Sequence, residues 1–531
     1  MKSTPSAVTP TLGQLAAEAG AVVSEDAADL QISSVSLDSG QAAPGGLFAA
    51  LPGTRVHGAT YAAQSAAAAI LTDAAGREIL AKAGEKRPVL VVEDVRAVLG
   101  RVSARVYGQP SKSLTLLGVT GTSGKTTTTY LLEQGLIAAG CEVGLIGTTG
   151  TRIRGRDVPT SLTTPEAPTL QALFAQMLSE GVTHVVMEVS SHALSLGRVD
   201  GSFFDVAGFT NLSQDHLDFH PTMEDYFEAK ARFFDPASPV HAARSVVCVD
   251  DAWGERMLDR AGEGLAVGTR GQAVLDCSAT LLDVTPAGAQ HISLTLAGAA
   301  YELTLPLPGA FNVANAALAT AMAHAAGVDV GRFVSGLENA AVPGRMERID
   351  AGQDFVAVVD YAHKPAAVAA ALETLRGQVA GRVGVVIGAG GDRDASKRPL
   401  MGREAAQRAD LVIVTDDNPR TEDPAAIRAA VIEGAAAAGA NAEIRESKSR
   451  AEAIEELIAW ARPGDAVIVV GKGHEVGQIV GTTTHPFDDR KEMRRALSLS
   501  GYGEHSDSGG ADSGGASTRE HTHEGSEGRR P

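Results

Sequence analysis

The segment from Thr120 to Thr127, Thr-Gly-Thr-Ser-Gly-Lys-Thr-Thr, has residue types and a spacing suited to a nucleoside triphosphate. Its glycines let backbone N–H groups face phosphate oxygens, Lys125 can reach the terminal phosphates, and the Thr126 hydroxyl can bind Mg²⁺. An apolar run precedes it and a helical pattern follows, as in a P-loop, although Val119 stands where the strict pattern has glycine. The segment could also be a glycine turn that only caps a helix, but we favour an ATP site. Its predicted residues are Gly121, Thr122, Ser123, Gly124, Lys125, Thr126 and Thr127.

Three further features could complete such a site. Glu188 follows a predicted strand at 183–187, and P-loop enzymes hold their metal with a carboxylate at a strand end. His216 and His220 are four residues apart, with Asp215 just before them and Asp218 between them, and Lys230 follows Tyr226 by four residues. Taken singly, these are an exposed glutamate, two histidines on a helix face and a surface lysine, so their interpretation depends on what surrounds them.

The acidic composition limits the classes of partner. The 531 residues include 46 Lys and Arg against 64 Asp and Glu, a formal net charge of −18 that would repel a phosphate backbone. We therefore expect no nucleic-acid partner, and an anionic ligand must be held by glycine-rich loops, helix N-termini and a few placed cations.

The length and the apolar content indicate several domains. Hydrophobic residues make up 44% of the chain, enough for several cores, and at roughly 100–200 residues per domain the length predicts about three domains.

The cysteines and the apolar runs indicate the compartment. Cys141, Cys248 and Cys277 are far apart and form no Cys-x-x-Cys pair, as expected of reduced thiols inside a cell. The N-terminus has no basic stretch followed by an apolar core, and no apolar run is long enough to span a bilayer. The sequence predicts a cytoplasmic protein with no membrane span.

Two polar or Gly/Pro-rich joints, at 107–113 and 342–345, divide the chain into blocks at 1–110, 111–343 and 344–500. In the second and third blocks, short apolar runs alternate with alanine-rich helical stretches, as in parallel α/β sheets. Residues 501–531 contain eight Gly, five Ser and three apolar residues, so we expect a disordered tail. Its His505, His521 and His523 could bind a metal, but a solvated tail without an assigned function is the favoured interpretation.

Four apolar runs of the third block end in polar motifs. These are Asp-Tyr-Ala-His at 360–363, Gly-Ala-Gly-Gly-Asp-Arg-Asp at 388–394, Asp-Asp-Asn-Pro-Arg at 416–420 and Gly-Lys-Gly-His-Glu at 471–475. Ligands of parallel sheets bind beyond the carboxyl ends of the strands, so we expect ligand-binding residues in these motifs. Arg393 stands where a dinucleotide fingerprint needs its third glycine, which argues against a redox enzyme.

The chain resembles the Mur ligases, the ATP-dependent amide-forming enzymes of peptidoglycan precursor synthesis. The resemblance rests on the P-loop, Glu-Val-Ser-Ser-His at 188–192, Asn-Leu-Ser-Gln-Asp-His-Leu-Asp-Phe-His at 211–220 and the Tyr-x-x-x-Lys that ends at Lys230. The motifs of the third block narrow it to the ligases that add the third residue of the stem peptide, over about residues 35–495. It implies three α/β domains, with a central P-loop ATPase-type parallel sheet and a C-terminal Rossmann-like domain.

The resemblance implies a ligase that consumes ATP and forms ADP. ATP would phosphorylate the D-Glu side-chain carboxylate of UDP-N-acetylmuramoyl-L-alanyl-D-glutamate, and an amine would then displace phosphate from the acyl phosphate. Lys125, His216 and Lys230 are the implied catalytic residues. Mg²⁺ would be held by Thr126, Glu188, His216 and, if its amine is carbamylated to a carboxylate, Lys230. Further ATP contacts are implied at Asn315, Arg345, Asp360 and His363.

The nucleotide sugar has two implied sets of contacts. Leu37 and Ser39 occupy the places of the family's UDP contacts, although turn chemistry explains these residues nearly as well. The residues that match the positions holding the muramoyl dipeptide and pyrophosphate are Thr163, Thr164, Ser190 and Arg198. A guanidinium suits that position because it can fork onto anionic oxygens.

Arg420 predicts which amino acid is added. meso-Diaminopimelate differs from lysine by a second carboxylate on the distal carbon, so a selective site needs a fixed cation there. The sequence Asp-Asn-Pro-Arg resembles the diaminopimelate-adding form, whereas lysine-adding relatives usually lack the arginine. The implied contacts to diaminopimelate are Arg393, Asp417, Asn418, Pro419, Arg420, Gly471 and Glu475.

Three alternatives remain open. The same ligase could add L-lysine or another diamine, or a more distant relative could extend another acidic chain, as folylpolyglutamate and cyanophycin ligases do. A nucleotide-binding scaffold that has lost catalysis is also conceivable. It is expected to have lost Lys125, Glu188, His216 or Lys230, and all four are present. We expect the protein to be a monomer.

Overall fold

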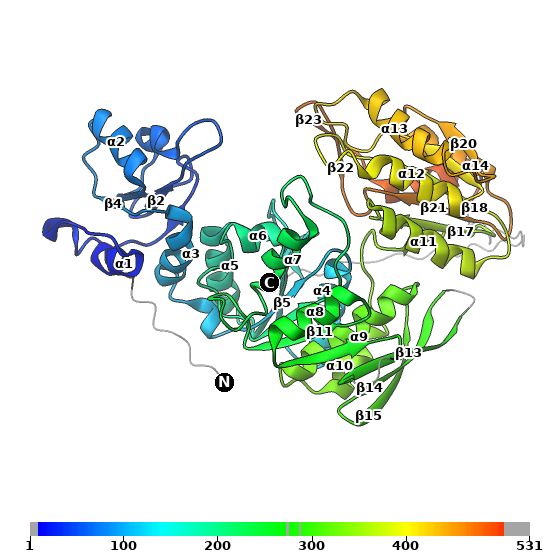
Figure 1. Cartoon of the computed structure of the whole chain (residues 1–531), viewed down its shortest axis with the longest axis horizontal. Helices are drawn as coiled ribbons and strands as arrows, with labels where there is room; N and C mark the ends of the chain where they lie inside the picture. Colours follow the sequence, from blue (N-terminus) through cyan, green and yellow to red (C-terminus); the bar gives the residue numbers. More distant parts are fainter. Residues whose placement is uncertain (1–8, 272–274, 286–287, 504–531) are drawn as a thin grey trace, which may run out of the picture.

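The computed structural model describes residues 9–271, 275–285 and 288–503. Within these ranges, Figure 1 shows three α/β bodies: an N-terminal one in blue at the left, a central one in cyan to green, and a C-terminal one in yellow to red at the upper right. Separate sheets form their centres, which confirms the predicted class of three α/β domains. Among the described helices, none has the length and apolar character needed to cross a bilayer.

The N-terminal domain is built on a four-stranded parallel sheet in the order β1-β2-β3-β4. Leu47 and Leu71 pack against α1 and α3 on one face, while Phe48 and Ile70 pack against α2 on the other, as expected from the alternation of strand side chains. The elements are α1 (Leu12–Ala19), η1 (Glu25–Ala27), β1 (Val35–Ser36), β2 (Leu47–Ala50), η2 (Gly58–Gln64), β3 (Ala69–Thr72), α2 (Ala74–Lys82), β4 (Val89–Val91), α3 (Val95–Val106) and η3 (Pro110–Lys112).

The central domain has an eleven-stranded sheet in the order β15-β14-β13-β12-β11-β10-β5-β9-β6-β7-β8. Strands β13 to β6 in this order are parallel, and antiparallel strands extend both edges. The elements are β5 (Thr115–Thr120), α4 (Lys125–Ala138), β6 (Val143–Gly147), β7 (Gly150–Ile153), β8 (Arg156–Val158), α5 (Ala167–Ser179), β9 (His184–Glu188), α6 (Ser191–Ser195), β10 (Val206–Phe209), α7 (Met223–Ala231), β11 (Arg244–Cys248), α8 (Ala252–Ala261), β12 (Gly264–Gly268), β13 (Cys277–Val284), β14 (Gln290–Leu296), β15 (Ala299–Leu305), α9 (Ala310–Ala325) and α10 (Val330–Leu337).

Strand β5 lies in the middle of this sheet and is buried on both faces. Leu117 and Val119 pack towards α4, α9 and α10, whereas Leu116 packs with residues of α5, α7 and α8 on the opposite face. A parallel strand covered on both sides needs apolar residues at every position, which explains the continuous apolar run before the P-loop. Val119, which stands where the strict P-loop pattern has glycine, is a fully buried residue of this strand.

The C-terminal domain has a six-stranded sheet in the order β16-β17-β21-β18-β19-β20, parallel except for β16. Helices α11, α12 and α13 cover one face, and α14 and α15 cover the other. The elements are β16 (Glu347–Arg348), β17 (Val356–Asp360), α11 (Pro365–Gln378), β18 (Val383–Ile387), α12 (Lys397–Arg408), β19 (Leu411–Val414), α13 (Pro424–Ala436), β20 (Glu443–Glu446), α14 (Arg450–Trp460), β21 (Ala466–Val470), β22 (Gly477–Val480), β23 (Thr483–Pro486) and α15 (Asp489–Leu499).

The four polar motifs of this domain begin where β17, β18, β19 and β21 end. Because these strands are parallel neighbours, their carboxyl ends lie at one edge of the sheet. The predicted positions of the motifs after strands are therefore confirmed.

Two sequence-based expectations need correction. Tyr502 packs edge-on against Phe355, with ring centres 5.7 Å apart, so the ordered chain continues past the expected tail boundary at 501. The Tyr502 side chain packs against the domain core, which the polar composition of its segment did not predict. The rest of the predicted tail, including His505, His521 and His523, lies outside the described residues. The segment at 211–222 forms a loop rather than the helix considered for His216 and His220.

Candidate active site

The P-loop connects β5 to α4 and packs tightly against its surroundings. Gly121 and Gly124 have φ angles of 142° and 88°, which other residues adopt only with strain. A Cβ at Gly121 would lie 1.9 Å from Thr210 Oγ1, and one at Gly124 would lie 2.4 Å from Asn315 Oδ1. Both glycines are therefore required for this loop conformation, whose backbone at the N-terminus of α4 suits phosphate oxygens.

Lys125 is folded onto the loop that it follows. Its Nζ donates to the carbonyl oxygens of Gly121 and Thr122 at 2.9 and 3.2 Å. Burial, with Lys364 nearby, lowers the pKa of Lys125 to about 8. Phosphate oxygens would be stronger acceptors than these carbonyls and would favour the charged amine.

Glu188, at the end of β9, is joined to the first turn of α4. Its Oε1 accepts from Thr126 Oγ1 at 2.9 Å and from Thr148 N at 2.8 Å, and its Oε2 accepts from Thr148 Oγ1 at 3.0 Å. Arg345, from the start of the C-terminal domain, donates to Thr126 Oγ1 at 3.1 Å. Thr148 was not foreseen, since a threonine in a turn carries no distinctive pattern.

This oxygen pair fits Mg²⁺, which usually takes one or two carboxylates together with substrate phosphates. In the described part of the chain, no three His, Cys, Asp or Glu residues form a group that could hold a metal ion. His216 contacts Asp215 rather than the Thr126–Glu188 pair. The structure thus brings Thr126 and Glu188 together and places His216 in a different set of contacts.

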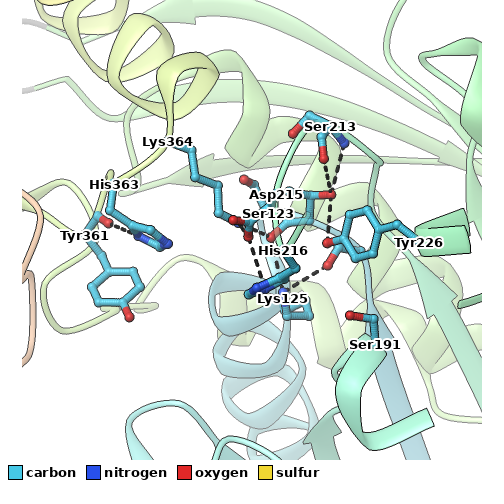
Figure 2. Close-up of polar contacts among 12 residues, drawn as sticks. Ser123, Lys125, Ser191, Ser213, Asp215, His216, Tyr226, Tyr361, His363 and Lys364 are labelled. Atoms are coloured by element: carbon cyan, nitrogen blue, oxygen red, sulfur yellow. Dashed lines mark hydrogen bonds and ion pairs between the residues drawn. The ribbon is translucent and has the colours of Figure 1, made fainter. Parts of the chain in front are cut away.

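His216 lies in the loop after β10 with a φ of 54°. Its Nε2 is 3.1 Å from Asp215 Oδ2, and Lys364 Nζ approaches the same oxygen at 2.8 Å (Figure 2). Burial lowers the pKa of His216 to about 2, so its imidazole is neutral at physiological pH. Although burial favours a neutral carboxyl, Lys364 and His216 hold the pKa of Asp215 below its usual value. The sequence analysis assigned no role to Asp215 or Lys364.

Lys230 is buried beneath the P-loop, with 1% of its surface exposed, so it is not a surface lysine. Its Nζ donates to Gly121 O at 3.0 Å and lies 4.6 Å from the centre of the Tyr226 ring. Burial, reinforced by the charges of Lys125 and Lys364, lowers its pKa well below the usual value. A neutral amine at this position retains the lone pair that nucleophilic chemistry needs.

A cavity of about 1220 Å³ lies between the central and C-terminal domains. It brings together most of the predicted ATP and dipeptide residues. The predicted residues that do not line it are Leu37, Ser39, Gly121, Lys230, Asp417, Asn418, Pro419, Arg420, Gly471 and Glu475. Among the predicted residues on its wall are Thr122, Ser123, Gly124, Lys125, Thr126, Thr127, Thr163, Thr164, Glu188, Ser190, Arg198, His216, Asn315, Arg345, Asp360, His363 and Arg393.

Asp360 and His363 shape the C-terminal wall of this cavity. Asp360 accepts from the backbone N–H groups of Met346 and Ala362 at 2.7 and 2.8 Å, and so fixes the linker that carries Arg345. The Arg345 guanidinium lies 4.2 Å from the centre of the Tyr361 ring. Burial lowers the pKa of His363 to about 3, which leaves its ring neutral. The Arg345 guanidinium is therefore held between Thr126 and the Tyr361 ring.

The predicted dipeptide residues form a connected group at the end of β9. Thr164 Oγ1 donates to Glu188 O at 2.8 Å and accepts from Ser190 N at 3.1 Å. Arg198 pairs with Glu166 at 2.9 Å, and Arg96 of the N-terminal domain reaches the same carboxylate at 3.3 Å. Glu166, which the sequence analysis did not single out, thus connects this group to the N-terminal domain.

Arg393 and Arg420 both flank Gly390. A Cβ at Gly390 would lie 3.0 Å from Arg420 Nη1 and 3.8 Å from Arg393 Cγ. Arg420 Nη1 donates to Gly391 O at 2.7 Å, and Asn418 Nδ2 donates to Glu475 Oε2 at 3.0 Å. Burial raises the pKa of Glu475, and the Arg420 charge opposes part of this rise. A guanidinium and a carboxylate near each other suit the carboxylate and ammonium of one amino-acid end.

Lys472 holds this group together and was missed by the sequence analysis. It is completely buried, and its Nζ lies 3.1 Å from Asp417 Oδ1, 2.8 Å from Asn418 Oδ1 and 2.9 Å from Gly477 O. An ammonium has three donors, so these acceptors use all of them. Lys472 therefore positions Asp417 and Asn418 and has no donor left for a ligand.

Replacing Lys472 with Met should destabilise the protein by about 3 kcal/mol, because the Asp417 carboxylate would be buried without its cation. The measurement is the free energy of unfolding from denaturant titration. Lys491→Met, on an exposed lysine of α15, removes the same charge from the surface and should change it little. Equal stabilities of the two variants would contradict the role assigned to Lys472.

Comparison with known proteins decides the family. The Mur ligase middle domain matches residues 119–323, the glutamate ligase domain of Mur ligases matches 344–473, and the catalytic domain of the Mur ligase family matches 31–107. The chain belongs to the Mur ligase family. The resemblance seen in its sequence is thereby confirmed.

Several relatives of this Mur ligase are named UDP-N-acetylmuramoyl-L-alanyl-D-glutamate--2,6-diaminopimelate ligase. The protein of Corynebacterium glutamicum is 62% identical over 494 residues, covering 91% of this chain and 95% of its own. That of Streptomyces coelicolor is 46% identical, covering 92% and 96%. A solved structure of the same name has a TM-score of 0.65 at 33% identity, covering 92% of this Mur ligase and 99% of that chain. A MurF ligase from Thermotoga maritima in complex with ADP has a TM-score of 0.60 at 19% identity, covering 88% and 97%, and shows the shared fold.

Proposed function

We propose that this Mur ligase joins meso-diaminopimelate to UDP-N-acetylmuramoyl-L-alanyl-D-glutamate with cleavage of ATP to ADP and phosphate, a step in peptidoglycan precursor synthesis. This is the reaction of the MurE group. The observation that carries the proposal is the cavity in which the P-loop, Glu188, Arg198 and Arg393 meet. The high identity to relatives named for this reaction supports it.

In the first step, an oxygen of the D-Glu side-chain carboxylate attacks the terminal phosphorus of ATP, and the bond to the ADP oxygen breaks. The amine then attacks the acyl carbon, loses a proton and forms the amide, and phosphate leaves with the electron pair of the C–O bond. Lys125 and Arg345 lie on the cavity wall, where they can neutralise phosphate charge. When bound, Mg²⁺ supplies further charge neutralisation, and Thr126 and Glu188 are the residues placed to hold it.

Lys230 acts through its modification in this proposal. The neutral amine attacks CO₂, forms an N–C bond and releases a proton, which converts the side chain into a carbamate. The low pKa that burial gives this amine supports the reaction, because only the neutral form is nucleophilic. The resulting carboxylate would provide an oxygen ligand beside the P-loop, and His216 is neutral and available as a nitrogen ligand.

The deciding experiment is phosphate release with ATP, Mg²⁺ and the UDP-muramoyl dipeptide, with meso-diaminopimelate, L-lysine or L-ornithine added in parallel. We expect turnover with diaminopimelate and little with the other two amines. Turnover with lysine instead would keep the ligase and discard the role of Arg420. No turnover with any amine, in protein that binds ATP, would overturn the proposal in favour of another acidic acceptor or a scaffold.

We further propose that the protein acts as a cytoplasmic monomer. Its nucleotide substrates belong to that compartment, and one chain contains the whole cavity, with Lys125, Glu188 and Arg345 on its wall. Sedimentation of the purified protein at working concentration tests the monomer directly.

A further inference from the structure

Lys364 is a buried cation that the proposed reaction has not yet used. It follows the Asp-Tyr-Ala-His motif immediately before α11, and 7% of its surface is exposed. Its Nζ lies 2.8 Å from Asp215 Oδ2 and donates to Thr122 O at 2.9 Å. Figure 2 shows the side chain reaching from the C-terminal domain towards Asp215. An ammonium of one domain thus lies on the ATP loop of another.

The P-loop carbonyl that Lys364 contacts is also used by Lys125, whose Nζ donates to Thr122 O at 3.2 Å. The two like charges repel each other, and Lys364 contributes to the lowered pKa of Lys125. A group with several negative charges placed between these ammoniums would remove that repulsion. The terminal phosphate of ATP is such a group, and the P-loop is where it binds.

Lys364 also has a donor to spare. An ammonium carries three N–H donors, and in the described part of the chain Asp215 and Thr122 take two of them. Lys364 lines the cavity, so the third donor is available to a ligand there. Lys472 differs in this respect, because its three donors are all used within the protein.

We propose that Lys364, together with Lys125, binds the terminal phosphate of ATP and remains in contact with this phosphate during its transfer to the acceptor carboxylate. This inference rests on the proposed function. Lys364 acts only by neutralising charge while the bond to ADP breaks and the bond to the carboxylate oxygen forms. Asp215 fixes the position of its Nζ. Because Lys364 belongs to the C-terminal domain, binding of the terminal phosphate favours the arrangement in which that domain contacts the P-loop.

The test compares ADP with a non-hydrolysable ATP analogue, which differ in the terminal phosphate. Calorimetry with Mg²⁺ and the whole protein gives both dissociation constants. Lys364→Met should weaken binding of the analogue about 10–100-fold and change ADP binding little, the loss expected for one charged hydrogen bond. Lys364→Arg, which keeps the charge, should retain most of the preference for the analogue. Lys448→Met, on an exposed lysine of the same domain, should bind both nucleotides like the wild type.

Two outcomes would overturn this inference. Equal weakening of ADP and the analogue would mean that Lys364 only joins the two domains, and unchanged binding of both would mean that it contacts no phosphate. Neither outcome concerns the acceptor or the amine, which are absent from the experiment. If the wild type failed to ligate diaminopimelate, the proposed function would be refuted. The ratio of the dissociation constants for ADP and the ATP analogue would still test the role of Lys364.

Discussion

Lys230→Met is expected to lower the rate of ligation by about 10²–10³-fold, a loss typical of removing one charge-stabilising group from a preorganised site. Methionine fills the volume of the buried side chain but has no amine to react with CO₂. The rate is measured as phosphate release with saturating substrates. Lys125 also donates to Gly121 O, so this carbonyl keeps a partner and the P-loop should still bind ADP.

Carbon dioxide provides the matched control for this prediction. The wild type should lose activity in buffer freed of CO₂ and regain it with bicarbonate, whereas Lys230→Met should respond to neither treatment. Lys82→Ala, on an exposed lysine, should behave like the wild type in both buffers. A Lys230→Met enzyme with the wild-type rate would refute the carbamate.

Arg420→Ala is expected to lower kcat/KM for meso-diaminopimelate by about 100-fold while ATP binding is retained. The guanidinium would no longer pair with the distal carboxylate, and a charge-assisted bidentate contact is worth about that much. The preference for diaminopimelate over lysine should fall by a similar factor, because lysine lacks the lost contact. Parallel kinetics with the two amines measure both effects.

The turn around Arg420 should survive this change. Its backbone N–H donates to Ile479 O at 3.0 Å, and its carbonyl accepts from Gly481 N at 2.7 Å, independently of the side chain. Arg420→Lys keeps the charge but loses the fork, and should fall between the wild type and the alanine variant. Arg462→Ala removes an exposed arginine of the same domain and serves as the matched control. An unchanged kcat/KM for diaminopimelate in Arg420→Ala would refute the assignment.

Features carried by a short continuous segment were predictable from the sequence. The P-loop is one, because glycines at fixed offsets between a strand and a helix impose its geometry locally, and Gly121 and Gly124 have the positive φ angles this requires. The placement of the polar motifs after β17, β18, β19 and β21 is another. Alternating apolar and helical segments imply parallel strands, and parallel strands end at one edge.

Other placements depended on contacts between domains. Leu37 and Ser39 matched a pattern but do not line the cavity, because a turn motif does not specify how its domain is oriented. Lys230 looked like a surface residue, and only packing beneath the P-loop made it buried and lowered its pKa. In the sequence, Lys472 is only one residue of a glycine-rich motif. Its contacts with Asp417, Asn418 and Gly477 form only in the folded domain.

The sequence by itself determined the family, the nucleotide loop and the motifs at the strand ends, since each is encoded by neighbouring residues whose spacing fixes their geometry. Only the tertiary structure decided that Asp215, Lys364 and Thr122 meet. Each is ordinary in its own segment, and the chain between Asp215 and Lys364 passes through most of one domain before entering the next. A charged side chain binds a ligand or another domain strongly only where folding removes water and brings the two groups together. The distance between groups that are far apart in the sequence is not encoded in any local pattern.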